Sequence, residues 1–122
     1  MDEKMKKLKV KHNGKSGPEY KVQQTIIKMM RRKGWFVKVV PGSAFLSGMP
    51  DLFTTHKIFG IRLVEVKLPK MKGSRFTKAQ LETFPLLTSH GAGVWVLTSD
   101  SDTEYAKLKQ PPNWYKYLKI MK

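Results

Sequence analysis

The chain has 122 residues and a formal net charge of +15 at pH 7, with 40% hydrophobic residues. It has no cysteine, which excludes thiol chemistry, disulfides and cysteine zinc sites, and fits an intracellular protein. No apolar run approaches the roughly 20 residues of a membrane span, so we expect one soluble domain with an acidic partner, nucleic acid before an anionic membrane surface.

The first segment is rich in lysine. Residues 1–15 carry six lysines around a few apolar positions, and we interpret them as a basic arm that precedes a single domain over residues 16–122. A solvated tail or an edge strand that only aids solubility is the alternative interpretation of this segment.

The first helix is predicted from its caps and its apolar stripe. Ser16 can cap it, Pro18 suits its first turn and Gly34 ends it. Glu19 falls on the same helix face as Ile26, which belongs to the buried stripe. Glu19 could instead be only a helix-cap acid that the macrodipole favours.

Three strands are predicted next, over residues 35–40, 51–55 and 61–68, because these runs are rich in aromatic and β-branched residues. The second and third are joined by a five-residue loop that ends at a glycine, which indicates a hairpin. That hairpin register would set Asp51 opposite Glu65 on one face of the sheet.

A second helix is predicted from Thr77, which forms a capping box with Gln80, to about Leu87. Pro85 should kink this helix or split it into two turns. Gln80 is in phase with the end of the core stripe, although it could serve only the capping box. The expected core stripe is Leu81, Phe84 and Leu87.

The remaining chain predicts one strand and two helices. Residues 94–97 are apolar on both faces, as in a buried central strand. We expect a short helix over about 102–109 and, after two prolines, an aromatic and basic helix from Asn113. Its aromatic residues are expected to be exposed: Trp114, Tyr115 and Tyr117.

One acid-x-lysine triplet stands out by its context. In a chain with 20 lysines, about one or two such triplets arise by chance, and three occur, beginning at Asp2, Glu19 and Glu65. Only Glu65 and Lys67 lie in a strand-like run, where alternation puts both side chains on one face. Only they have an aspartate, Asp51, that can lie opposite.

The facing acids predict a metal site. Directly paired strand residues have β-carbons about 4.5–5.5 Å apart, so Asp51 and Glu65 could bind one divalent ion. Two carboxylates that close repel each other unless a cation neutralises them. Taken singly, Asp51 could be a turn residue after proline, and Glu65 and Lys67 could be solvated charges on an edge strand.

The pattern resembles the PD-(D/E)xK nuclease superfamily, and within it the small stand-alone VRR-NUC type of phages and bacteria. The matching segments are Glu19, residues 48–51, residues 65–67 and Gln80. The resemblance implies an α/β fold with a restriction-endonuclease-like αβββαβ core, in which helices flank a mixed sheet. It also implies a metal-dependent endonuclease that cuts branched DNA or Holliday junctions in repair or recombination. The same resemblance implies a homodimer in the cytoplasm of a bacterium or a phage-infected cell.

The resemblance also implies a role for each site residue. Asp51, Glu65 and the Val66 carbonyl would hold Mg²⁺ or Mn²⁺, with Glu19 assisting through a water or a second ion. Lys67 would orient the attacking water and stabilise negative charge, and Gln80 would position the water or the phosphate.

Basic residues beside the site would contact DNA phosphates without reading sequence. A non-catalytic nucleic-acid binder that keeps the nuclease architecture is the main alternative. A protein of anionic membranes is a weaker one, because no long amphipathic helix accompanies the charge. The predicted phosphate contacts are Lys70, Lys72, Arg75 and Lys78.

Overall fold

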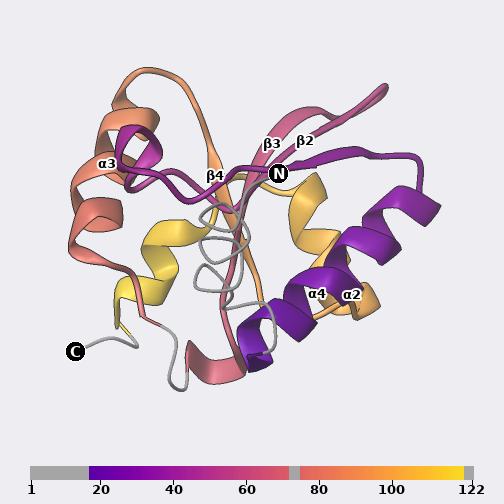
Figure 1. The fold of residues 1–122 in the computed structure, drawn as a ribbon. Coiled ribbons are helices and arrows are strands. Elements are labelled where there is room, and N and C mark those ends of the chain that lie inside the picture. The colour runs from indigo at the N-terminus through magenta and orange to yellow at the C-terminus, as the bar shows by residue number, and fades with distance from the viewer. Residues whose placement is uncertain (1–16, 72–74, 120–122) are drawn as a thin grey trace, which may run out of the picture.

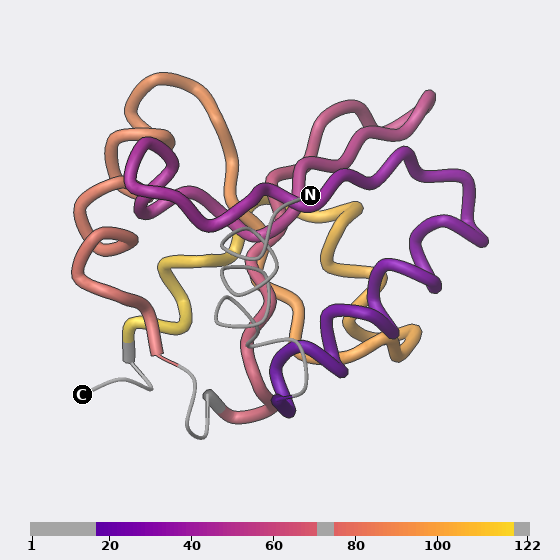
Figure 2. Tube along the Cα trace, in the orientation of Figure 1, coloured from indigo at the N-terminus to yellow at the C-terminus, as the bar shows by residue number. Residues whose placement is uncertain are grey.

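The fold is known from a computed structural model that describes residues 17–71 and 75–119 (Figures 1 and 2). The basic arm, the Ser16 cap and Lys72 lie outside these residues. In chain order the elements are α2 (Pro18–Arg32), β1 (Phe36–Val39), η2 (Ala44–Leu46), β2 (Leu52–His56), β3 (Gly60–Val66), η3 (Pro69–Met71), α3 (Lys78–Ser89), β4 (Val94–Leu97), α4 (Asp102–Ala106), η4 (Lys107–Lys109) and η5 (Trp114–Lys119).

The described strands form one mixed sheet in the order β1-β2-β3-β4. β1, β2 and β3 pair antiparallel, and β3 and β4 pair parallel. The predicted hairpin register is confirmed, since Phe53 pairs with Leu63 and Thr55 with Ile61. One further pair, His56 with Gly60, leaves a loop of three residues rather than the expected five.

Helices cover the two faces of the sheet, as Figure 1 shows with α2 and α4 on one side and α3 on the other. On the α2 side, Ile26 and Met30 pack with Leu52, Val64 and other buried residues. On the α3 side, a second core is built from Phe76, Phe84, Val94, Val96 and Trp114. No helix in the described part of the chain is long and apolar enough to cross a membrane.

The first helix ends as its sequence predicts. The backbone N–H of Gly34 donates to the Arg31 carbonyl, and that of Trp35 donates to the Met30 carbonyl. These two bonds form a Schellman motif, which needs a residue with positive φ at the position of Gly34. Gly34 has a φ of 91°, so this turn directs the chain from α2 into β1.

The second helix differs from its prediction at Leu81, and Pro85 does not split it. Pro85 lies inside α3, which continues to Ser89 without being split. Leu81 is 43% exposed instead of lying in the core. Pro85 has no N–H to donate to the Leu81 carbonyl, so the helix continues past Pro85 without that hydrogen bond.

The strand β4 is buried on both faces, as expected, but it lies at an edge of the described sheet rather than at its centre. Its outer edge is covered by the chain that follows. The side-chain amide of Asn113 accepts from the Val96 N–H at 2.6 Å and donates to the Val96 carbonyl at 3.2 Å. A side chain therefore occupies the hydrogen bonds that a fifth strand would make.

The C-terminal aromatic residues are not equally exposed. η5 is a 3₁₀ helix, and Trp114 is only 7% exposed because it packs on Phe84 and Phe76 and donates to the Thr88 hydroxyl. The expectation that Trp114 is exposed was wrong. Tyr115 is 52% exposed, as expected, whereas Tyr117 is only partly exposed and its hydroxyl accepts a hydrogen bond from Lys107.

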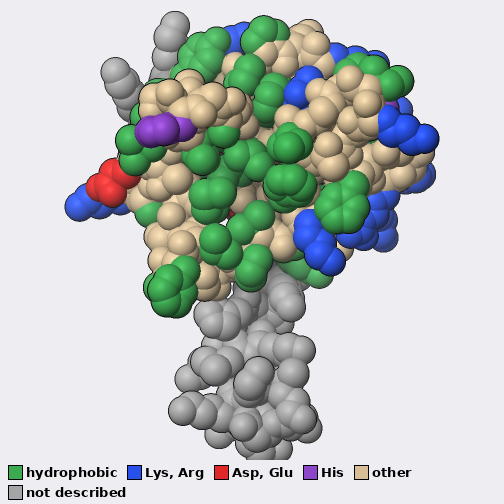
Figure 3. All heavy atoms as spheres, turned by 90° about the horizontal axis from the view of Figure 1, so that it is seen from above, with side chains coloured by type: hydrophobic (Ala, Val, Ile, Leu, Met, Phe, Trp, Pro, Cys, Tyr) green, Lys and Arg blue, Asp and Glu red, His purple; other side chains and the backbone are tan. Residues whose placement is uncertain are grey.

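Part of the sheet on the α3 side keeps apolar side chains in contact with solvent. Phe36 and Ile61 are more than half exposed and, by the strand register, share one face with Phe53. Viewed from above, hydrophobic side chains gather in the middle of the surface, with lysines and arginines toward its edge (Figure 3). The helices described on this side therefore cover β4 more fully than they cover the hairpin of β2 and β3.

The loop before β2 is held against α3 by a glycine. Gly48 has a φ of 83°, and a Cβ placed there would lie 2.5 Å from the Ala79 carbonyl oxygen and 2.3 Å from the Thr83 hydroxyl. Only glycine fits both the backbone conformation and the close approach. This contact sets the path of the chain three residues before Asp51.

We predict that Gly48→Ala lowers the free energy of unfolding by about 1–3 kcal/mol, since it combines positive φ with a clash against helix backbone. Gly42→Ala is the matched control, because a Cβ added at Gly42 would meet no other atom within 4 Å. Urea denaturation of the two variants measures the difference. Equal stability of the variants would contradict the close contact.

Candidate active site

Asp51 and Glu65 meet where β2 begins and β3 ends. The backbone N–H of Asp51 donates to Glu65 Oε1 at 3.2 Å, and the backbone N–H of Val66 donates to Asp51 Oδ2 at 2.8 Å. Each carboxyl group is thus held by the backbone of the opposite strand. The predicted register therefore brings the two acids together through specific hydrogen bonds.

Burial raises the pKa values of both acids. The pKa of Glu65, which is 1% exposed, rises to about 8, first through desolvation and then through the charge of Asp51. The pKa of Asp51 rises to about 6, also through desolvation first, although its hydrogen bond from Val66 opposes the rise. A buried and a half-buried acid whose charges repel each other form a site that a cation would stabilise.

Lys67 and Gln80 complete a buried polar network beside Glu65. Lys67 Nζ lies 3.1 Å from Glu65 Oε2 and donates to the Gln80 side chain at 3.3 Å and to the Arg75 carbonyl at 2.7 Å. These three contacts use all three hydrogens of the ammonium group. Gln80 Nε2 donates to Glu65 Oε2 at 2.8 Å, so Gln80 links the acid to the lysine.

Gln80 has two roles that the sequence presented as alternatives. Its Oε1 accepts from the Thr77 N–H, while the Gln80 N–H donates to the Thr77 hydroxyl, so the predicted capping box is present. The same side chain also contacts Glu65 and Lys67. Helix capping therefore fixes the side chain that reaches into the candidate site.

Glu19 enters from the first turn of α2 and is half-buried. It lies near enough to Asp51 for its charge to raise the pKa of that residue. The described residues contain no group of three histidine, aspartate or glutamate side chains arranged to hold a metal ion. The structure thus joins Asp51, Glu65, Lys67 and Gln80 directly and leaves Glu19 at the border of the site.

The oxygen atoms present fit a hard divalent cation. Both Asp51 and Glu65 are carboxylates, the ligand type that Mg²⁺ and Mn²⁺ favour. In a strand, the N–H and the carbonyl of one residue face the same side, so the Val66 carbonyl faces Asp51 as its N–H does. Two acids and one carbonyl therefore converge at the end of β3.

Three of the four expected phosphate contacts lie on chain segments that flank Lys67 and Gln80 in sequence. Lys70, Arg75 and Lys78 are exposed, and the Arg75 carbonyl itself bonds to Lys67. Phe76 was not foreseen from the sequence, and its ring lies 5.3 Å from Lys67 Nζ. Its place directly before the Thr77 cap was the available signal, since a hydrophobic residue there often packs against the helix that follows.

No family model and no curated protein matches the chain. A solved structure described as a VRR-NUC domain matches it with a TM-score of 0.60 and 24% sequence identity, over 75% of this chain and 95% of that one. This chain has a VRR-NUC nuclease-type fold. The resemblance inferred from the motifs is therefore confirmed at the level of the fold, including the α/β class and the mixed sheet flanked by helices.

The raised pKa of Glu65 predicts that the protein loses stability as pH rises when no metal is present. The pKa of Glu65 is about 8 in the folded state, whereas its ordinary value is 4.5. Between these pH values the folded state binds a proton that the unfolded state has lost, so the free energy of unfolding falls as pH rises. Glu65→Gln should reduce this fall between pH 6 and 8. Urea midpoints in a chelator at several pH values measure it.

Glu82→Gln serves as the control for this measurement, because Glu82 is an exposed acid on α3. It should keep the pH dependence of the unmodified protein. If Glu65→Gln also keeps that dependence unchanged, Glu65 does not carry the raised pKa.

Proposed function

We propose that this protein is a divalent-metal-dependent endonuclease that hydrolyses DNA phosphodiester bonds. The observation that carries the proposal is the pair of half-buried Asp51 and buried Glu65, joined to Lys67 at the end of β3. The nuclease-type fold supports it, and so does the net charge of +15, which favours a polyanionic substrate.

Asp51, Glu65 and the Val66 carbonyl would hold Mg²⁺ or Mn²⁺. Such an ion, when bound, supplies a water of lowered pKa and offsets charge on the phosphate. Gln80 keeps the Glu65 carboxyl turned toward Asp51, because its amide donates to the Oε2 atom of Glu65. Glu19 adds negative charge near Asp51 and would thereby favour cation binding.

Lys67 would stabilise the negative charge that develops on the phosphate. Its ammonium group lies within 3.1 Å of Glu65 and close to the exposed start of α3. To reach a phosphate it must exchange one of its present partners, and the Arg75 carbonyl is the partner on the rim of the site. Lys70, Arg75 and Lys78 would hold the DNA backbone around this point.

The full engagement of Lys67 also favours a second candidate function, a non-catalytic nucleic-acid binder. All three ammonium hydrogens are used within the protein. In this function the charge of Lys67 would only stabilise the carboxylates of Asp51 and Glu65. Cleavage assays separate the two candidates, because both of them bind DNA.

We expect cleavage of labelled DNA that depends on Mg²⁺ or Mn²⁺ and stops in EDTA. Asp51→Asn and Lys67→Met should each cleave at least about 100-fold more slowly, because each removes a group that stabilises the transition state. Branched, duplex and single-stranded substrates should be compared. Glu82→Gln, which changes an exposed acid on α3, should cleave at the unmodified rate.

Undiminished cleavage by Asp51→Asn would show that the assigned site is wrong. DNA binding without cleavage of any substrate would favour the non-catalytic binder. Preference for branched DNA and action as a homodimer are proposed from the family resemblance. A chain that sediments as a monomer would remove the homodimer from the proposal.

A further inference from the structure

A second polar site lies away from the acid pair, in a cleft of about 480 Å³ between η4 and η5. This volume is in the range of small-ligand sites. The cleft is lined by two lysines and two tyrosines, and no acidic residue is among its lining residues. The lining is Lys107, Gln110, Pro111, Asn113, Tyr115, Lys116 and Tyr117.

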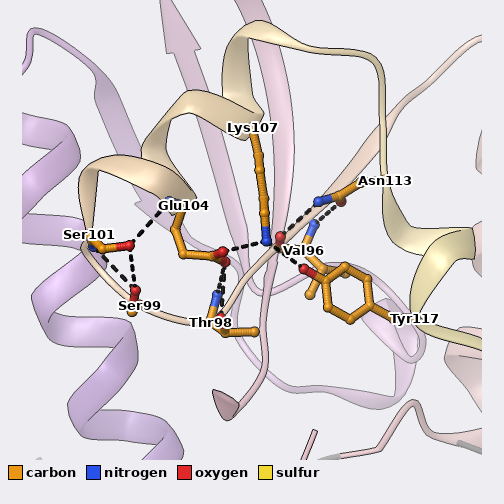
Figure 4. Close-up of polar contacts among 8 residues, drawn as sticks. All are labelled: Val96, Thr98, Ser99, Ser101, Glu104, Lys107, Asn113 and Tyr117. Carbon is orange, nitrogen blue, oxygen red and sulfur yellow. Dashed lines mark hydrogen bonds and ion pairs between the residues drawn. The ribbon is translucent and has the colours of Figure 1, made fainter. Parts of the chain in front are cut away.

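The inner wall of the cleft is fixed by bonds within the protein. Figure 4 shows Lys107 lying between Glu104 and Tyr117, with which it forms an ion pair and a hydrogen bond. Glu104 is itself held by the backbone N–H and the hydroxyl of Thr98. Asn113 is held on β4 by its two bonds to Val96. These groups shape the cleft in advance and do not need a ligand to order them.

The outer rim of the cleft carries exposed side chains that no hydrogen bond to a described residue holds in place. Tyr115, Lys116 and Gln110 are exposed, and their side-chain polar atoms make no hydrogen bond with the residues that the structure describes. One half-exposed aromatic ring, one cation and one amide thus lie at the mouth of a preformed cleft. An aromatic face stacks on a base, an amide pairs with a base edge, and an ammonium binds a phosphate.

A run of aromatic contacts joins this cleft to the candidate active site. Lys67 Nζ lies 5.3 Å from the centre of the Phe76 ring, Phe76 lies 6.4 Å from Trp114, and Trp114 lies 6.3 Å from Tyr115. Only two rings therefore separate the active-site lysine from the exposed tyrosine. The cleft and the candidate active site therefore border the same buried aromatic cluster.

The geometry points to the cleft between η4 and η5 as a binding site for an unpaired nucleotide, with its base on Tyr115 and its phosphate at Lys116. The Gln110 amide faces the base edge, and Lys107 adds positive charge to the inner wall. This inference rests on the proposed action on DNA and extends it, because it gives the substrate a single-stranded segment near the cut. The nucleotide belongs to a DNA strand, and a free mononucleotide has the same chemistry.

The test is a binding measurement in Asp51→Asn protein, so that no DNA is cut. Fluorescence anisotropy compares a duplex bearing a single-stranded thymidine tail with a blunt duplex. Tyr115→Ala should weaken binding of the tailed DNA about fivefold or more, the effect expected for one lost stacking contact, and leave the blunt duplex unchanged. Tyr115→Phe keeps the ring and should bind as the parent does.

Lys116→Gln should lower the salt dependence of tailed-duplex binding by about one phosphate contact. Lys28→Gln is its control, because Lys28 is an exposed lysine on α2 that does not line the cleft. Thymidine 5′-monophosphate is added as competitor to separate the two sources. If Tyr115→Ala weakens binding of the mononucleotide but not binding of the tailed DNA, the cleft is a site for a free nucleotide.

The outcomes distinguish this inference from the proposed function. If the Asp51→Asn parent binds none of these DNAs, the nuclease proposal loses its substrate. If the parent binds them and Tyr115→Ala changes neither tailed DNA nor mononucleotide binding, only the cleft inference is overturned. Circular dichroism of each variant confirms that exposed-site substitutions leave the fold intact.

Discussion

The placement of buried Glu65 beside half-buried Asp51 is the constraint around which the rest of this structure is arranged. Burying a carboxylate is costly, and burying two together is more so, because each charge opposes the other. The chain meets the cost in part with backbone hydrogen bonds, since Asp51 and Glu65 each accept an N–H from the opposite strand. The remaining cost appears in the raised pKa values of both acids. The two carboxylates repel each other most when no cation lies between them. A bound divalent cation would relieve that repulsion, and the relief would add to its binding free energy.

The surrounding elements serve to hold this arrangement. Gly48 lets the loop approach α3 closely enough to deliver Asp51 to the start of β2. The cap of α3 orients Gln80 toward Glu65. Phe76 and the core beneath it enclose Lys67, which is 3% exposed. A change in any of these contacts, although none is itself an acid or a ligand, should reach the site through the position of one of its side chains.

The hairpin and the acid pair were predictable from sequence because they depend on short-range patterns. Alternating apolar residues and a glycine that ends the loop set the register, and that register puts Asp51 opposite Glu65. Features that depend on distant contacts were not predictable. β4 looked like a central strand because it is buried on both faces, yet its outer edge is covered by Asn113, which lies 17 residues beyond Val96. Trp114 looked exposed because its partners Phe76 and Phe84 come from another element.

The central claim is that Asp51 and Glu65 form a cation site. The most direct measurement is a crystal of the protein soaked in Mn²⁺, with anomalous diffraction used to locate the ion. The account predicts a peak between the Asp51 and Glu65 carboxylates, within coordination distance of the Val66 carbonyl, that is absent from crystals of Asp51→Asn. A fully soaked crystal with no peak at this position, or with the only peak elsewhere on the surface, would contradict it.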